Sequence, residues 1–486
     1  MPVAATVRRP LVMAGVMSGM FMIAIEATIV STAMPQIAAQ LGDLHLYSWV
    51  FSAFLLAQTA TTMVFGKLAD IFGRKPVLLI GIAIFLVGSL LCGFAPTMLW
   101  LIAFRLVQGL GAGAIQPIVL TIVGDLYPGH ERGRVQGYLS SVWGVSSVLG
   151  PLAGGLIVQH LNWAWVFWIN LPVGIGASAL FLLFLHERVA SATRRVDAAG
   201  AVLFTAAVAA LMVALTEFGD ARQAAIAAIA VCFGAGWLFV LQERRAADPM
   251  VAFGLWARRP IATANAATLL AGMALIGLTA FLPMYVQGVL NRTALVAGFT
   301  LTAMSFGWPI AATIAARHLF HRYGLRQTLL LGGTLLPLGA AAMLVLRPGT
   351  GPLLAGFGSL VMGLGMGLLS TSAIVIIQGS VGWNERGAAT ASNVFSRNLG
   401  STFGATLLGG VLNGSLAHMA AGGEAVSFDR IRDLLNDPIR GLADEGVQAA
   451  LGQSLHLTFW AMFLLTVGAF AVANLVPRVA LKQPAE

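Results

Sequence analysis

Charged residues are scarce in this 486-residue chain: only 10% are Asp, Glu, Lys or Arg, whereas 58% are hydrophobic. Soluble domains carry about a quarter charged residues, so this composition excludes a soluble globular protein. Cysteine is nearly absent too, because Cys92 and Cys232 are the only two, and both lie in apolar runs. We interpret them as small hydrophobic residues rather than as a disulfide or a metal pair.

Signatures of energy-coupled and catalytic sites are also missing. The three lysines, Lys67, Lys75 and Lys482, belong to no G-x-x-x-x-G-K-[ST] loop, which argues against an ATP-driven pump. The chain has no H-E-x-x-H motif, and its eight histidines are scattered. We therefore expect no cofactor and no metal, and we keep a membrane-embedded enzyme only as a distant alternative. The net charge is +9, and the basic residues that produce it lie in short loops between the apolar runs. Membrane topology explains this distribution better than a nucleic-acid partner does.

Long apolar runs fill most of the chain, and its mean hydropathy is +0.86. A membrane-spanning helix needs about 20 mostly apolar residues, and fourteen runs meet that length. They lie near 11–36, 48–68, 76–94, 97–122, 134–158, 163–185, 198–218, 222–242, 262–285, 295–316, 327–347, 352–378, 389–416 and 454–477. Twenty of the 28 basic residues fall on one side of these spans, which predicts a multi-pass membrane protein with both termini in the cytoplasm.

An internal repeat divides the chain. Glu131-Arg132-Gly133 recurs 254 residues later as Glu385-Arg386-Gly387, and the glycines of 109–113 recur at the same offset in 363–367. Two parallel six-helix halves are a known transporter architecture. The repeat predicts an all-α membrane fold with three parts: an N-terminal six-helix half at 11–185, a linker with two extra membrane helices at 186–261, and a C-terminal six-helix half at 262–478.

Four stretches carry a resemblance to a known family. The loop at 66–75, GKLADIFGRK, resembles the G-x-x-x-D-x-x-G-[RK]-[RK] signature of the major facilitator superfamily, with Ile71 where a basic residue is usual. IEATIVSTAMP at 25–35 resembles the L-D-x-T-I-V-N-V-A-L-P pattern of the fourteen-helix drug:proton antiporters, with Glu26 for Asp and Ser31 for Asn. RLVQG at 105–109 resembles R-x-x-Q-G. The antiporter glycine motif is matched by Gly137, Gly150, Pro151, Gly154 and Gly155, with Ser146 where a glycine is usual.

This resemblance implies a major facilitator fold and a proton-coupled efflux antiporter. Such a protein exports lipophilic or cationic drugs by alternating access, in a bacterial-type inner membrane, and the proton gradient drives it. Its partners would be small-molecule substrates, protons and the lipid bilayer, and a periplasmic adaptor protein is left open. A dedicated exporter of a metabolite, siderophore or lipid is the alternative.

Glu26 is the acidic residue that lies deep in a predicted span. An apolar medium disfavours a charged carboxylate, so such a group can bind and release a proton near neutral pH. Glu26 lies about ten residues from the outer end of the first span, and Arg105 lies about eight residues from the outer start of the fourth span. A helix rises about 1.5 Å per residue, so the two residues lie at similar depths in the membrane. We expect them to pair or to communicate through Gln108, and the resemblance makes Arg105 part of the proton relay. The alternatives are a structural carboxylate and an arginine that only binds backbone carbonyls.

Two groups of residues are assigned to conformational switching. One is the loop with Gly66, Asp70, Gly73, Arg74 and Lys75, whose charges we expect to form ion pairs with Glu131, Arg132 and Arg134 of the next inner loop. The other is the glycine motif around Gly150 and Pro151, with Gly154 and Gly155. Its small residues allow close helix approach, and we expect the fifth span to pack there against a helix of the other half, although simple tight packing is an alternative.

The substrate cavity is assigned to Phe21, Gln108, Trp143, Asn393 and Arg397. Arg397 lies on a polar face of the thirteenth predicted span, and a charged residue there should face a cavity rather than lipid. A brace between helices is an equally good interpretation of this arginine.

Overall fold

The computed structural model describes residues 8–41, 46–127, 129–187, 197–217, 222–246, 253–292, 294–347, 349, 351–420 and 445–478. Some side chains inside these helices are not described, and among them are those of Arg132, Arg134 and Pro151. In this part of the chain the regular structure is helical and contains no strand.

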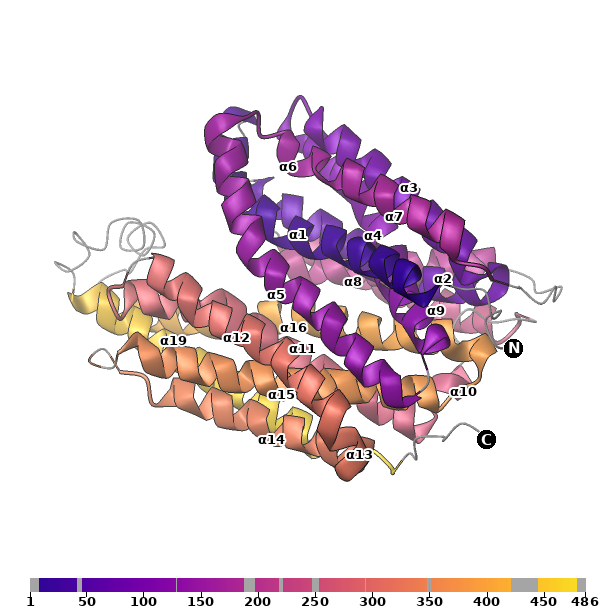
Figure 1. The fold of residues 1–486 in the computed structure, drawn as a ribbon. Helices are drawn as coiled ribbons and strands as arrows, with labels where there is room; N and C mark the ends of the chain where they lie inside the picture. Colours follow the sequence, from indigo (N-terminus) through magenta and orange to yellow (C-terminus); the bar gives the residue numbers. More distant parts are fainter. Residues whose placement is uncertain are drawn as a thin grey trace. The chain divides into compact units, whose positions relative to one another are not determined.

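The described helices follow one another along the chain (Figure 1). The first nine are α1 (Arg9–Leu41), α2 (Tyr47–Phe72), α3 (Arg74–Gly93), α4 (Met98–Leu126), α5 (Gly129–His160), α6 (Trp165–Trp168), α7 (Asn170–Phe184), α8 (Ala198–Glu217) and α9 (Arg222–Glu243). The others are α10 (Phe253–Trp256), α11 (Arg259–Gly288), α12 (Ala294–Ile314), a π-helical turn (Ala315–Leu319), α13 (Phe320–Arg322), α14 (Gly324–Leu344), α15 (Pro352–Gly379), a 3₁₀ turn (Trp383–Glu385), α16 (Arg386–Ala420) and α19 (Glu445–Ala473).

The chain forms two compact units. The first contains residues 1–261 together with 374–395, and the second contains 262–373 and 396–480. The first unit therefore includes the end of α15 and the beginning of α16 in addition to the N-terminal helices. This places the start of α16 in the same unit as the loop at 66–75.

Twelve helices of the described part are long and apolar enough to cross a membrane, so the predicted count of fourteen is not confirmed. The two predicted spans without a counterpart among the twelve are 198–218 and 389–416. Helices are present at both places: α8 is apolar over 198–214, and α16 carries many polar residues along its 35 residues. The helical character of the chain was thus predicted correctly at these places.

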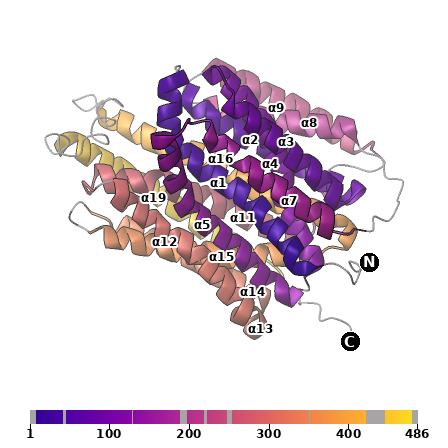
Figure 2. The same cartoon turned by 45° about the horizontal axis from the view of Figure 1, so that its top comes forward.

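The helices α8 and α9, which the sequence predicts as an inserted pair, pack on each other along their lengths, and α8 also packs against α2 (Figure 2). Both helices expose apolar side chains: Val202 of α8 is 68% exposed, and Phe233 and Trp237 of α9 are 76% and 68% exposed. Exposed aromatic side chains on a helix pair fit a lipid environment rather than water.

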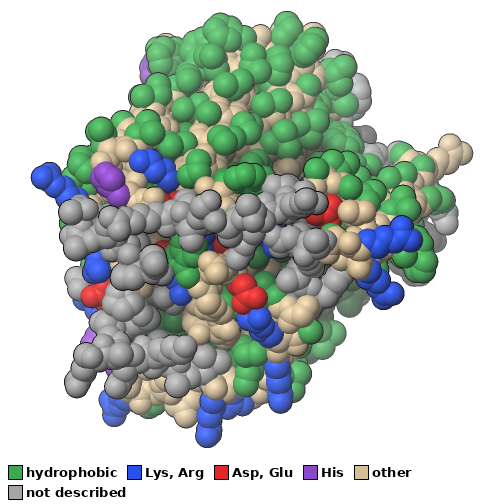
Figure 3. Space-filling view, turned by 90° about the vertical axis from the view of Figure 1, so that its right-hand side faces the viewer, with side chains coloured by type: hydrophobic (Ala, Val, Ile, Leu, Met, Phe, Trp, Pro, Cys, Tyr) green, Lys and Arg blue, Asp and Glu red, His purple; other side chains and the backbone are tan. Residues whose placement is uncertain are grey.

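Hydrophobic side chains cover the sides of the helices in the upper part of Figure 3, which belongs to the first unit. Lys and Arg side chains are visible on the face turned to the viewer, and Arg244, Arg258 and Arg326 lie at or beside the ends of α9, α11 and α14. An apolar flank with charged ends is the distribution that a membrane-spanning bundle needs.

The repeat predicted from the glycine pattern has a counterpart in the packing of each unit. At Gly111 of α4, a side chain would meet the backbone of Gly81 in α3. At Gly365 of α15, it would meet the backbone of Gly332 in α14. The turns before α3 and α14 correspond as well, because both are made by a glycine with positive φ, Gly73 (96°) and Gly324 (81°). Small residues at these positions let the helix backbones approach closely in both units.

Candidate functional site

Among the acids that the structure describes, Glu26 in the middle of α1 is the most deeply buried, and its side chain is inaccessible to solvent. Its Oε1 forms an ion pair with Nη1 of Arg105 in α4. Its Oε2 accepts a hydrogen bond of 2.6 Å from Nδ2 of Asn170, the first residue of α7. The pairing of Glu26 with Arg105 predicted from their depths is therefore present in the structure.

Arg105 is held by more than its acid partner. Its Nε donates to the carbonyl oxygen of Val50 (3.1 Å), and its Nη1 also donates to Oε1 of Gln108 (2.7 Å). The guanidinium lies 4.3 Å from the ring centre of Phe54. Desolvation of a buried ion pair is costly unless further hydrogen bonds satisfy both partners, and these contacts supply them. Arg105 therefore forms the predicted ion pair and also binds a backbone carbonyl, so it is not an arginine that only binds carbonyls.

A chain of hydrogen bonds connects this ion pair to two residues that the sequence analysis did not identify, Ser89 and Asn170. Gln108 donates to Oγ of Ser89 (3.1 Å), Asn170 donates to the same oxygen (3.0 Å), and Ser89 donates to the carbonyl of Phe167 (2.8 Å). Glu26, Ser89, Arg105, Gln108 and Asn170 bring α1, α3, α4 and α7 together around one carboxylate, and the carbonyl of Phe167 adds α6. We call Glu26, Arg105, Gln108, Ser89 and Asn170 the buried polar network. A polar residue inside a long apolar run was the only sequence signal for the two that were missed.

A second polar site surrounds Asp70, at the end of α2. Asp70 is 6% exposed and accepts backbone hydrogen bonds from Gly387 (3.0 Å) and Ala388 (2.7 Å), in the first turn of α16. It also accepts a hydrogen bond of 2.8 Å from Nη2 of Arg74. A carboxylate at a helix N-terminus satisfies unpaired N–H groups and interacts favourably with the helix dipole. Asp70 therefore fastens the start of α16 to the turn between α2 and α3.

Arg74 lies at the centre of this site and is 2% exposed. Its Nε lies 3.2 Å from Oδ2 of Asp125, and its Nη2 donates to the carbonyl oxygen of Trp383 (2.8 Å), whose ring centre is 4.0 Å from the guanidinium. Asp125 in turn pairs with Arg386 (2.5 Å). We call Asp70, Arg74, Asp125 and Arg386 the charge cluster.

The predicted charge cluster joins Asp70 to Arg74, but the other acids close to Arg74 are not the one expected from the next inner loop. Glu131, which lies in the first turn of α5, forms an ion pair with Arg9, at 4.0 Å. The acids near Arg74 are instead Asp125 and, at 4.0 Å, Glu187. The reason is that α4 continues to Leu126 and packs closely on α2, so the last turn of α4, rather than the loop after it, meets the loop at 66–75. The predicted contribution of Arg132 and Arg134 concerns side chains outside the described part.

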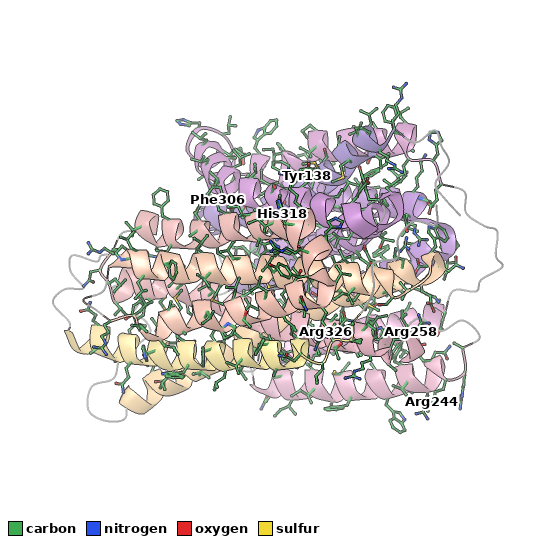
Figure 4. All side chains as sticks on the ribbon, turned by 60° about the horizontal axis from the view of Figure 1, so that its bottom comes forward. Tyr138, Arg244, Arg258, Phe306, His318 and Arg326 are labelled. Carbon is green, nitrogen blue, oxygen red and sulfur yellow. The ribbon has the colours of Figure 1, made fainter. Side chains whose placement is uncertain are left out.

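Lys75 contacts the C-terminal end of α7. Its Nζ donates to the carbonyl oxygen of Leu182 (2.9 Å), and its backbone N–H donates to Glu187 (3.0 Å). In the second unit, Arg326 makes the corresponding contacts at the end of α19, to the carbonyl oxygens of Val476 (2.7 Å) and Asn474 (3.0 Å) (Figure 4). Cations at helix C-termini bind unpaired carbonyls and interact favourably with the dipole.

The glycines of the loop allow close backbone contact. Gly73 has φ 96° and ψ 155°, so it ends α2 and starts α3 in a conformation that other residues rarely adopt. Gly66 lies against Ala391 and the carbonyl oxygen of Gly387, so α2 and the start of α16 touch. Both glycines therefore help to place the charge cluster.

The glycine motif in α5 has a partner within its own unit, and its predicted contact with a helix of the other half stays a prediction. Gly150 packs against Thr28 in α1, a helix of the same unit rather than of the other half, and Thr28 donates to the carbonyl oxygen of Ser146 (3.0 Å). Gly154 is buried, whereas Gly155 is half-buried with open space beside it. The alternative weighed for this motif, tight packing, holds at Gly150, because α1 and α5 lie in contact along their lengths.

The residues assigned to the substrate cavity are not brought together in the described structure of either unit. Gln108 is fully buried in the buried polar network, Phe21 is half-buried among apolar neighbours, and Trp143 is 37% exposed on α5. In α16, Asn393 is buried and Arg397 is half-buried. Their role in substrate binding stays a prediction.

Comparison with known proteins agrees with this architecture. A family model described as Major Facilitator Superfamily matches residues 16–405. Multidrug transporter protein MdtP of Bacillus subtilis (strain 168) is 34% identical over 415 residues, which cover 84% of this chain and 76% of that protein. Multidrug resistance protein 3 of the same organism is 34% identical over 405 residues, 82% of this chain and 79% of that protein.

A solved structure shares the fold. The crystal structure of the human organic anion transporter MFSD10 (TETRAN) superposes with a TM-score of 0.65 over 94% of this chain and 99% of that chain, at 16% sequence identity. Three observations point to the same class of protein. The described helices are long and apolar enough to cross a membrane, an acid and an arginine pair inside them, and the family model matches most of the chain. The chain belongs to the Major Facilitator Superfamily and is a membrane transporter rather than an enzyme.

Proposed function

We propose that this transporter is a proton-coupled efflux antiporter that exports lipophilic or cationic compounds by alternating access. The observation that carries this proposal is the environment of Glu26: a solvent-inaccessible carboxylate, paired with Arg105 and hydrogen-bonded by Asn170. Ionisable residues inside membrane spans are costly, and they mark ion and proton pathways in transporters. The names of the two Bacillus relatives support a drug-like substrate.

Glu26 has the properties of a proton-coupling site. When it is ionised, it neutralises Arg105, and when it binds a proton, the ion pair is lost while Arg105 keeps the oxygens of Gln108 and Val50 as acceptors. Protonation thereby changes the attraction between α1 and α4 without leaving the arginine unpaired. A transporter that releases substrate when Glu26 is protonated would exchange the two across the membrane.

The charge cluster provides the second element of the mechanism. Asp70 binds the first turn of α16, and Arg386 of the same turn binds Asp125. Since these contacts hold α2, α4 and α16 at one end, they have to break when the helix ends separate. We propose that they stabilise one of the two alternating conformations.

The sequence resembles the fourteen-helix drug:proton antiporters, and this resemblance suggests a subfamily for the transporter. We propose that α8 and α16 complete a fourteen-helix drug:proton antiporter with halves at 11–185 and 262–478 and an inserted pair between them. The excess of Lys and Arg on one side favours cytoplasmic termini in a bacterial inner membrane. The proton gradient alone would drive transport, without a cofactor, and a periplasmic adaptor protein remains open as a partner.

The test is active efflux of ethidium from energised cells or proteoliposomes, with and without an uncoupler. Wild type is compared with Glu26→Gln and with a matched control, Glu385→Gln, which makes the same change in a pair with Arg258 whose side chains are both more than 40% exposed. We expect the uncoupler and Glu26→Gln each to abolish active efflux, and Glu385→Gln to retain it.

Two results would contradict this proposal. Undiminished active efflux by Glu26→Gln would remove Glu26 from proton coupling. Absence of ethidium efflux by wild type, in preparations where another small molecule is exported, would favour the dedicated exporter of a metabolite, siderophore or lipid.

A further inference from the structure

Asn170 occupies a special position next to the acid of the buried polar network. It is the first residue of α7 and is 1% exposed. Its Nδ2 donates to Oε2 of Glu26 (2.6 Å) and to Oγ of Ser89 (3.0 Å). Its Oδ1 is buried and has no hydrogen-bond partner among the described residues. Most buried polar atoms in folded proteins are paired, so an unused acceptor beside an ionisable group requires an explanation.

We propose that Asn170 is a positioning residue that hydrogen-bonds Glu26 in both of its protonation states, by exchanging its amide nitrogen for its amide oxygen. This inference rests on the proposed function, in which Glu26 binds and releases a proton during transport. It assigns to α7 a part in proton coupling through a residue that touches the carboxyl directly.

The chemistry of the two side chains makes this exchange possible. An ionised carboxylate is an acceptor only, so it needs the N–H of the amide, whereas a protonated carboxyl also carries an O–H donor. Oε1 of Glu26 faces Arg105, which has only donors to offer. A proton is therefore expected on Oε2, the oxygen that faces Asn170. Rotation of the amide by half a turn replaces Nδ2 by Oδ1 at that place, and the free acceptor then receives the new O–H.

The neighbouring groups can follow this rotation. Ser89 now accepts from Gln108 and Asn170 and donates to the carbonyl oxygen of Phe167. A hydroxyl hydrogen rotates freely, so Ser89 can donate to Oδ1 of the rotated amide instead. The carbonyl oxygen of Phe167 would still accept the backbone N–H of Ile169. Oδ1 would then accept from both Glu26 and Ser89, and Nδ2 would replace Oδ1 as the atom of the amide without a described partner.

The other charged or titratable groups that face Glu26 are few. α4 contributes Arg105, and α3 contributes the thiol of Cys92, whose Sγ lies 3.9 Å from Oε1 of Gln108. The membrane part of α1 has no second ionisable residue, α6 and α7 have none at all, and residues 139–159 of α5 have none either. Asn170 is thus the neutral partner that faces the titrating oxygen.

The experiment titrates Glu26 directly and needs no substrate. Purified full-length protein in lipid nanodiscs is studied by infrared difference spectroscopy across a series of pH values, and the carboxylic-acid C=O band of Glu26 is identified by its loss in Glu26→Gln. The midpoint of this band is then compared in wild type, Asn170→Leu and Asn170→Ser. The matched control is Thr62→Val, because Thr62 is fully buried and donates only to Gln58 of its own helix in the contacts described. Thermal unfolding is measured below and above the midpoint.

We expect Asn170→Leu to lower the unfolding temperature equally on both sides of the midpoint and to leave the midpoint within about half a pH unit of wild type, because it removes a hydrogen bond from both states. Asn170→Ser retains a donor and an acceptor, so it should recover part of the stability with the same midpoint. Thr62→Val should leave the midpoint unchanged.

The overturning result is a midpoint that moves to higher pH by about one to two units in Asn170→Leu, the size expected when only the charged state loses a hydrogen bond. Asn170 would then be an ordinary donor to the carboxylate. Unchanged stability in Asn170→Leu would also reject the proposal. If wild type has no band that Glu26→Gln removes, the failure lies instead with proton binding by Glu26, and hence with the proposed function.

Discussion

Replacement of Asp70 by Asn tests whether one carboxylate holds the start of α16 in place. The carboxylate accepts from the backbone N–H groups of Gly387 and Ala388 through different oxygens, and from Arg74 through the first of them. An asparagine can keep one of these oxygens, but it places an NH₂ group where the other was, so one backbone hydrogen bond is lost. Arg74 keeps Asp125 as an acidic partner, at 3.2 Å, and is not left with an uncompensated charge.

The magnitude follows from these contacts. A hydrogen bond to a charged group contributes about 1.5–3 kcal/mol, and a negative charge at a helix N-terminus contributes about 0.3–1 kcal/mol. We therefore expect Asp70→Asn to lower the free energy of unfolding by about 2–4 kcal/mol. The matched change Glu385→Gln disrupts a solvent-exposed pair with Arg258 and should cost less than about 1 kcal/mol.

The assay is unfolding of the purified variants by SDS titration in mixed micelles, followed by tryptophan fluorescence and circular dichroism. The test compares the loss of unfolding free energy in Asp70→Asn with the loss in Glu385→Gln. Equal losses for Asp70→Asn and Glu385→Gln would show that the buried contacts of Asp70 contribute no more than an exposed ion pair, and the reasoning would be refuted.

Two glycine substitutions test the backbone geometry. Gly73→Ala forces an L side chain into φ 96° and should lower the free energy of unfolding by about 1–3 kcal/mol in the same assay. Its control, Gly176→Ala, lies on an open helix face and should be neutral or stabilising. Similar changes in unfolding free energy for both variants would contradict backbone strain at position 73. Gly88→Ala would place a Cβ 2.5 Å from the backbone nitrogen of Gln108, so it should cost about 1–3 kcal/mol through overpacking and slow ethidium efflux. Wild-type stability and efflux for Gly88→Ala would show that α3 and α4 separate freely.

Several features could be predicted from the sequence because they depend on local rules. Composition and the length of the apolar runs indicated a helical membrane protein, and twelve helices of the described part satisfy those criteria. The depth of a residue in a helix follows from a fixed rise per residue, which is why Glu26 and Arg105 could be paired before their positions were known. The turn at Gly73 was marked by glycine, since only glycine adopts its backbone angles without strain.

Other contacts were decided only by how the helices pack. A membrane helix that is apolar on all sides gives no periodic signal of which face meets which neighbour. The sequence therefore did not reveal that Gly150 faces Thr28 in α1, that Asp125 rather than Glu131 meets Arg74, or that Asn170 reaches Glu26.

The sequence by itself determined the class of the protein, the helical spans and the presence of a costly acid and arginine at the same depth, because hydropathy, helical rise and turn conformation are properties of short segments. Only the tertiary structure decided the further partners of these two charges, such as Asn170 for Glu26 and the carbonyl oxygen of Val50 for Arg105. Each partner comes from a helix distant in the chain, and its distance depends on the rotation and crossing of whole helices, which no short segment specifies.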